Sequence, residues 1–390
     1  MGRIHSLDSL RGIAAFVVII FHIFLSFNIF YNADRGFEYD NVLIKLFNET
    51  PLHTIWGGNE AVLLFFVLSG FVLAIPFQNN RISSYNSFIT KRFFRIYIPY
   101  IAVMAISVIL MMMLYEFKDA TGLSPAYDNR WNHDVTLGSI LAYIFMINYD
   151  TANVNGVVWT LYHEMRISFV FPLIMLVLLR FKPVRALSTL GAGLIIFTGV
   201  FVSPFVLFGR NEATLIIRDF GFTAYYTMFF VLGAFLSVYR KPIINWATNL
   251  SGISRFAMFL LSALLINGKW IVNIIPIKSS LLLYSPLAGV GIGVLFIVVL
   301  SSPLAEKMLT VKPLLFLGKI SYSLYLVHVL VIMTMTIAFD QVGLRMWGFI
   351  LSPLISIPIA YVAYKAFEEP AIKIGRHFGE KVENYEKRGS

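Results

Sequence analysis

Long apolar runs dominate this sequence. A membrane-spanning helix needs about 20 predominantly apolar residues to cross a hydrocarbon core of about 30 Å. Full-length spans are predicted at residues 10–30, 59–77, 93–114, 157–179, 186–208, 221–239, 254–275, 280–300, 314–338 and 346–367. The run 137–147 is too short to span and is expected to be re-entrant or interfacial. We therefore expect an all-α, polytopic transmembrane bundle of about ten spans plus one short helix.

Composition excludes other classes of protein. Hydrophobic residues make up 58% of the chain and charged residues 13%, whereas soluble domains average about 45–50% and 25%. A transmembrane β-barrel would show weak alternating segments of about ten residues, whereas this chain shows long unbroken apolar runs, so a β-barrel is excluded. The absence of cysteine removes disulfides, thiolate metal sites and a cysteine nucleophile, and we expect no metal. The net charge of +10 does not cluster on a soluble face, so we expect no nucleic-acid partner.

The basic residues predict the orientation of the spans. With the N-terminus inside and ten spans, 21 of the 31 lysines and arginines fall in cytoplasmic segments. This bias predicts that both termini are cytoplasmic, because loops on that side carry the excess of positive charge. No repeat or separate soluble domain is visible, so residues 1–390 are expected to form a single membrane domain with a short charged cytoplasmic tail after about residue 368.

Ionisable groups inside spans are costly unless they are paired or hydrated, and they are therefore functional candidates. Arg11 and His22 lie eleven residues apart in the first span, which is about three helical turns, so they share one face about 16 Å apart. An imidazole is well suited to proton transfer near neutral pH. The structural alternative is a snorkelling arginine and a satisfied buried histidine.

His163 and Glu164 lie in the fourth span, at roughly the depth that His22 reaches in the first. A carboxylate there is suited to orient an imidazole or to balance its charge. The alternative is a pairing of Glu164 with another span or with Arg166. Direct pairing with Arg166 is not expected, since the two side chains point about 200° apart.

Two further groups are notable. Ser321, Tyr325 and His328 form one polar stripe along the ninth span, which is also the pattern of hydrogen bonds between membrane helices. A basic group opens the third span, and its members are Lys91, Arg92 and Arg95. Three cations at a cytoplasmic helix start are suited to bind phosphates, although plain membrane anchoring produces the same pattern.

Six segments in this order resemble the integral membrane acyltransferase-3 family. They are LDSLRGIAAFVVIIFH, LLFFVLSGFVL, KRFFRIYIPY, NGVVWTLYHEMRISFVFP, GKISYSLYLVHV and the terminal FEEP. The family's arginine and histidine signature falls on Arg11 and His22. Its other motifs fall on Lys91, Arg92, Arg95, Trp159, Thr160, Leu161, Glu164, Ser321, Tyr322, Tyr325 and His328. One departure is Leu63, which stands where many members carry an aspartate, with Glu60 three residues earlier.

The resemblance implies an acyl-CoA-dependent O-acyltransferase, with acetyl-CoA as the expected donor. The acceptor is a hydroxyl of a cell-surface glycan or lipid-linked saccharide, and the expected location is the bacterial inner membrane, in contact with membrane lipid. Donor contacts are expected at Arg11, Lys91, Arg92, Arg95, Trp159 and Ser321.

Catalysis is expected from four residues: His22 as general base or acyl carrier, Glu164 orienting it, and Tyr325 or His328 donating to the oxyanion. Direct transfer and an acyl-histidine route both remain open. The alternatives are a proton-coupled transporter of glycan or lipid intermediates, or an acyltransferase with a small-molecule acceptor.

Overall fold

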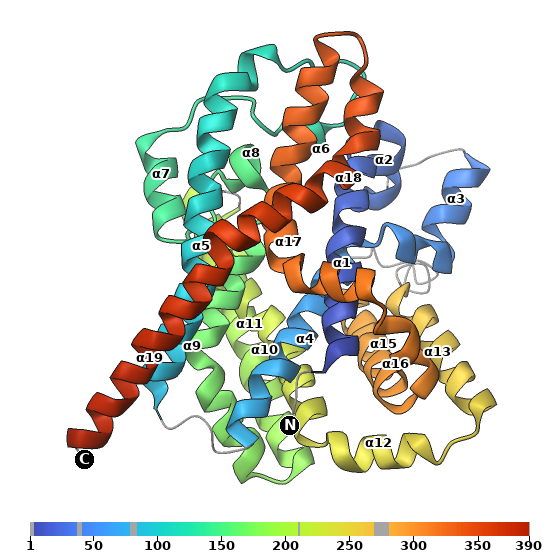
Figure 1. Ribbon diagram of the computed structural model, residues 1–390, viewed down its shortest axis with the longest axis vertical. Helices are drawn as coiled ribbons and strands as arrows, with labels where there is room; N and C mark the ends of the chain where they lie inside the picture. The colour runs from blue at the N-terminus through green and yellow to red at the C-terminus, as the bar shows by residue number, and fades with distance from the viewer. Residues whose placement is uncertain (1–3, 37–40, 79–83, 210, 269–280, 390) are drawn as a thin grey trace. The chain divides into compact units, whose positions relative to one another are not determined.

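The structure is a computed structural model that describes residues 4–36, 41–78, 84–209, 211–268 and 281–389 (Figure 1). Helices make up nearly all of these residues and no strand occurs among them, which confirms the all-α class. The helices longer than 14 residues are α1 (His5–Phe24), α4 (Gly58–Gln78), α5 (Tyr85–Leu114), α9 (Trp159–Arg180), α10 (Pro183–Phe208), α11 (Glu212–Val238), α13 (Gly252–Ile266), α15 (Leu281–Ser301), α17 (Lys312–Asp340), α18 (Arg345–Ala363) and α19 (Glu369–Gly389). The shorter ones are α2 (Asn28–Arg35), α3 (Val42–Asn48), η1 (Pro51–Ile55), η2 (Tyr115–Phe117), α6 (Pro125–Asp128), α7 (Leu137–Ile144), α8 (Thr151–Asn155), α12 (Arg240–Thr248), α16 (Pro303–Leu309) and the π-turn η3 (Tyr364–Glu368).

Nine helical segments within the described residues are long and apolar enough to cross a membrane. They coincide with nine of the ten expected spans. The tenth, 254–275, corresponds to α13, which has 15 residues; the remainder, 269–275, lies outside the described residues, as does residue 280 of the span 280–300. The run 137–147 forms the eight-residue helix α7, which is too short to span.

The first span is shorter than expected. Helix α1 ends at Phe24 rather than near residue 30. The Ser26 hydroxyl donates to the carbonyl of His22, and Phe27 is already extended. These interactions turn the chain into α2 soon after His22.

The chain divides into two compact units. The first contains Met1–Leu68, Glu116–Arg130 and Tyr239–Ala360, and within it α1 packs along α17 and α13 along α15. The second contains Ser69–Tyr115, Trp131–Val238 and Tyr361–Ser390, and within it α10 packs along α11 and α5 along α19.

The residues after about 368 are not a loose tail. They form α19, which lies along α5 (Figure 1). Gly375 and Gly379 face α5, and a Cβ at Gly375 would lie 2.7 Å from the Cβ of Phe94. Small residues four apart allow this close packing of two helices.

Candidate functional site

Two glycines set the register of α1 against α17 in the first unit. A Cβ on Gly12 would lie 2.5 Å from the backbone nitrogen of Gly318, and one on Gly318 would lie 2.3 Å from the carbonyl oxygen of Asp8. His22 follows Gly12 by ten residues, and His328 follows Gly318 by ten. Both histidines therefore lie about 15 Å beyond the glycine contact, because the helical rise is the same in both helices.

His22 and His328 are in contact at that level. Their ring centroids are 5.2 Å apart, and we call them the histidine pair. The ring of Tyr325 lies 5.9 Å from that of His328. The Ser321 hydroxyl donates within its own helix to the carbonyl of Gly318, 2.9 Å away. The structure thus brings together three of the four expected catalytic residues, while Ser321 bonds inside α17.

A residue that the sequence does not single out completes this group. Arg130 lies in the segment after α6, and its Nη2 is 2.8 Å from Nδ1 of His22. Its side chain is buried, with an exposed fraction of 5%. Burial lowers the pKa of Arg130 to about 10, so the guanidinium stays charged at neutral pH. A loop arginine carries no sequence signal for such a role.

The segment that carries Arg130 is fastened to both helices of the histidine pair. The Ser124 hydroxyl donates to the carbonyl of Leu25, and its backbone N–H donates to the carbonyl of Ser26 at 2.9 Å. The hydroxyl groups of Tyr127 and Thr336 are 3.0 Å apart, which links α6 to α17. These contacts hold Arg130 against His22.

Arg11 keeps its expected place on α1, eleven residues before His22, and its side chain is half-buried. The spacing fixes its separation from His22 along the helix axis at about 16 Å. Arg11 therefore remains a candidate to bind the anionic end of an extended ligand whose other end reaches the histidine pair.

The second unit contains a basic cavity of about 570 Å³ between the end of α4, α5 and α19. It is lined by Leu73, Pro76, Ser84, Ser87, Phe88, Lys91, Arg92, Arg95, Ile372, Arg376 and Glu383. All three cations expected to bind phosphates border it, and Arg376 of α19 is a fourth. Sequence reasoning missed Arg376 because it treated α19 as a tail; the Gly375 and Gly379 spacing is the signal that indicates a packed helix.

Arg92 differs from its neighbours in the cavity wall. Its Nη2 donates to Oε1 of Glu164 at 2.6 Å, and its Nε donates to the Ser168 hydroxyl at 3.2 Å. Glu164 therefore has a partner on α5 that the sequence does not reveal. Arg166 bonds Asp219 at 2.5 Å, in agreement with the expectation that it points away from Glu164. The expected action of Glu164 on His22 stays a prediction.

Asp219 of α11 is the centre of a second buried network. Besides Arg166, it accepts from Nδ2 of Asn148 at 2.9 Å, while Arg166 also donates to the carbonyl of Met146. His163 bonds the Thr223 hydroxyl at 2.9 Å, and its Nε2 lies 3.7 Å from Asp219. Sequence reasoning missed Asp219 because the predicted span began at residue 221, whereas α11 begins at Glu212. The network anchors the chain just after α7 to α9 and α11.

Trp159, expected at the donor site, packs instead in an aromatic group. Its ring centroid lies 5.5 Å from that of His163 and 5.4 Å from that of Tyr226. It is not among the residues that line the basic cavity. Its expected contact with the donor stays a prediction.

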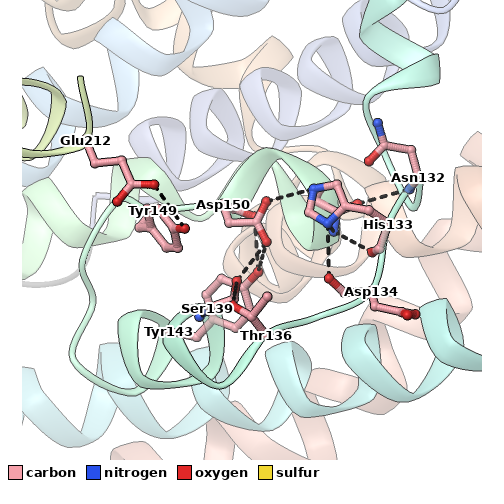
Figure 2. Close-up of polar contacts among 10 residues, drawn as sticks. Asn132, His133, Asp134, Thr136, Ser139, Tyr143, Tyr149, Asp150 and Glu212 are labelled. Atoms are coloured by element: carbon pink, nitrogen blue, oxygen red, sulfur yellow. Dashed lines mark hydrogen bonds and ion pairs between the residues drawn. The ribbon is translucent and has the colours of Figure 1, made fainter. Parts of the chain in front are cut away.

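Asp150 ties the segment 131–150 together (Figure 2). Its carboxylate lies 3.2 Å from Nε2 of His133 and accepts from the Ser139 hydroxyl at 2.9 Å. Trp131 is fully buried, and its Nε1 donates to the carbonyl of Val154. Because donors of the chain itself already bond the Asp150 carboxylate, we infer that this cluster stabilises the segment. Within the described residues, no group of three or more histidine, aspartate or glutamate side chains is placed to hold a metal ion.

The comparisons with known proteins agree with this architecture. A family model described as an acyltransferase domain matches residues 4–365. The chain belongs to the acyltransferase-3 family. It is therefore a membrane protein of a family of enzymes that transfer acyl groups, which favours this class over a transporter.

Two relatives illustrate the range of similarity. O-acetyltransferase OatA of Staphylococcus aureus (strain NCTC 8325 / PS 47) is 28% identical over 232 residues, which is 56% of this chain and 36% of the relative. Nodulation protein 10 of Rhizobium leguminosarum bv. viciae is 26% identical over 349 residues, which is 83% of this chain and 86% of the relative. The match thus spans about a third of the length of OatA. No solved structure matches the chain.

Proposed function

We propose that this protein is an O-acyltransferase that moves an acyl group, with acetyl as the first choice, from acyl-CoA to a hydroxyl of a cell-surface glycan or lipid-linked saccharide. The observation that carries the proposal is the histidine pair, made of half-buried His22 and fully buried His328, with Arg130 at Nδ1 of His22. Imidazoles supply proton transfer, and a fixed cation supplies charge stabilisation, which are the two needs of acyl transfer. The name of the relative OatA supports the choice of an acetyl group.

The basic cavity supports acyl-CoA as the donor. CoA carries phosphates at one end and its thioester at the end of a flexible arm. Lys91, Arg95 and Arg376 present cations to a cavity whose volume lies within the usual range for ligand sites, about 300–1,000 Å³. We assign the phosphates of the donor to the cations of this cavity. Arg11, in the first unit, remains a candidate donor contact from the sequence. The bacterial inner membrane, with both termini cytoplasmic, is the proposed setting, because cytosolic CoA must reach these cations.

Donor binding is the first test. Acetyl-CoA should raise the unfolding temperature of the detergent-purified protein, because a ligand that binds only the folded state stabilises it by about 2.7 kcal/mol at 100 times its Kd. The shift should shrink in Arg11→Ala, in Arg376→Ala and in the double variant Lys91→Ala/Arg95→Ala. Lys373→Ala, which removes an exposed cation of α19 outside the cavity lining, should leave it unchanged. An intact protein that shows no shift with donors of several chain lengths contradicts the proposal.

A further inference from the structure

The two histidines of the pair differ in which ring nitrogen carries the proton, and their hydrogen bonds show why. Nδ1 of His22 lies 2.8 Å from Nη2 of Arg130. A guanidinium has only donors, so Nδ1 of His22 must accept and carries no proton. In a neutral imidazole the other nitrogen then holds the hydrogen. His22 therefore presents an Nε2–H donor.

His328 has the reverse arrangement. Its Nδ1 lies 3.3 Å from the carbonyl oxygen of Leu324, one turn earlier on α17. A carbonyl only accepts, so Nδ1 of His328 carries the proton and Nε2 holds a free lone pair. That Nε2 is buried and has no hydrogen-bond partner among the described residues. A buried acceptor without a partner is costly, and such an atom in a reactive cluster indicates a place for a substrate donor.

Arg130 offers a second open position. Its Nη1 is also buried without a hydrogen-bond partner among the described residues, while Nη2 is held by His22. A charged donor kept in a buried site without a partner is suited to a negative charge that develops during a reaction. Arg130 also opposes a proton on Nδ1 of His22, since two donors and two positive charges would then face each other.

We infer that Nε2 of His328 is the general base of the reaction, and that Arg130 Nη1–H and His22 Nε2–H are the donors for the oxyanion. This inference rests on the proposed function and reverses the roles expected from the sequence, where His22 is the base and His328 a donor. His22 cannot accept a proton at Nε2, which already carries one, or at Nδ1 while Arg130 occupies it. The same two facts argue against an acyl intermediate on His22.

The transfer is a single addition and elimination at the thioester carbonyl carbon. The acceptor hydroxyl gives its proton to Nε2 of His328 while its oxygen bonds to the thioester carbonyl carbon. The carbonyl electron pair moves to the oxygen, which receives hydrogen bonds from Arg130 and His22. The intermediate collapses with cleavage of the carbon–sulfur bond, and the thiolate takes the proton back from His328. The products are the ester and CoA thiol, and the charges on His328 and on the oxyanion form and vanish together.

The first experiment reads the tautomers directly in the unmodified protein. Long-range ¹⁵N–¹H correlation NMR of the detergent-solubilised chain with ¹⁵N-labelled histidine distinguishes Nδ1–H from Nε2–H. The chain has only seven histidines, and His22→Gln and His328→Gln assign the two signals. At pH 7 we expect the proton of His22 on Nε2 and that of His328 on Nδ1. A His22 proton on Nδ1, a doubly protonated His22, or a His328 proton on Nε2 overturns the inference.

The second experiment distinguishes a hydrogen-bond donor from a base by comparing glutamine and alanine substitutions at each histidine. A glutamine amide can donate near the position of Nε2, so His22→Gln should retain at least tenfold more acetyl-CoA turnover than His22→Ala. Glutamine cannot serve as a base, so His328→Gln and His328→Ala should both fall by about 10²–10⁴-fold. Arg130→Gln should fall by about 10²–10³-fold, as expected for an oxyanion donor. His5→Gln, at an exposed histidine of α1, is the matched control.

The outcomes separate this inference from the proposed function. Acetyl-CoA thermal shifts show which variants still fold and bind donor. A folded His22→Gln that is as inactive as His22→Ala, or a His328→Gln that keeps its rate, overturns the assignment of roles while donor turnover by the unmodified protein stands. An unmodified protein that neither binds nor turns over acetyl-CoA contradicts the proposed function instead.

Discussion

The three cations at the start of α5 differ in the contacts that they make. Lys91, Arg92 and Arg95 all border the basic cavity, but the guanidinium of Arg92 is bonded to Glu164 and Ser168. We therefore assign phosphate binding to Lys91 and Arg95, and to Arg92 the role of positioning α9 against α5. Glu164 is the partner of Arg92 in the second unit.

Removing the charge of Glu164 tests this pairing. Glu164→Gln leaves the largely buried Arg92 with a neutral partner, and hydrogen bonds to charged groups contribute about 1.5–3 kcal/mol. We expect the free energy of unfolding to fall by about that amount, measured by chemical denaturation in detergent. Arg92→Met should cost a similar amount, and the double variant should cost much less than the sum of the two. Additive losses would contradict the pairing, and Glu306→Gln at an exposed site is the control.

Whole elements are positioned by contacts between small residues. Helices α1 and α17 meet where Gly12 contacts Gly318, and this contact sets which side chains share a level above it. The histidine pair depends on that register, because each histidine lies ten residues beyond its glycine. Helix α19 uses Gly375 and Gly379 in the same way to bring Arg376 to the basic cavity.

Adding one methyl group at the crossing should separate the histidine pair. In Gly318→Ala the new Cβ would overlap the backbone of Asp8, which cannot be relieved by a side-chain rotation. Overpacking of this kind typically costs about 1–3 kcal/mol. We expect a lower unfolding temperature and at least tenfold slower acyl transfer, with membrane insertion retained. Gly199→Ala on α10 is the control, because a Cβ there meets nothing within 4 Å; equal effects of the two changes would contradict the role of the crossing.

The whole molecule is organised by the membrane. Helix α10 exposes apolar side chains along its length, among them Ile195, Val200 and Leu207. Water-soluble monomers rarely expose such continuous apolar patches. The excess of basic residues in alternate loops then predicts the orientation of the chain, with both termini cytoplasmic.

The absence of native cysteine makes this orientation directly measurable. A single cysteine at Lys381, an exposed residue of α19, should be protected from a membrane-impermeant maleimide in intact cells and should react after lysis. A single cysteine at Asn132, which is also exposed, should react in intact cells. The reverse pattern would overturn the predicted topology.

The site could be anticipated from the sequence only in part. His22, Tyr325 and His328 were identifiable as polar residues in apolar spans. Placing a polar side chain in the bilayer costs free energy, so such positions stand out without any knowledge of packing. Arg130 and Arg376 were not identifiable, because a loop cation and a cation in a charged terminal segment are ordinary at the surface of any protein. Asp219 was not singled out either, because the predicted span began at residue 221, whereas α11 begins at Glu212 and so includes Asp219.

The sequence by itself indicated nine of the ten spans, the helical class and the common face of Arg11 and His22, because each depends on local geometry along one helix. The tertiary structure decided which residues meet: Arg130 reaches His22 across 108 positions, and Arg92 reaches Glu164 across 72. It also decided the tautomers of the histidine pair, because they follow from the partners at Nδ1 rather than from the residue type. Sequence spacing shows which side chains share a face of one helix, but not which residues of another helix they contact. Contacts between helices depend on where backbones can approach closely, as they do at Gly12 and Gly318.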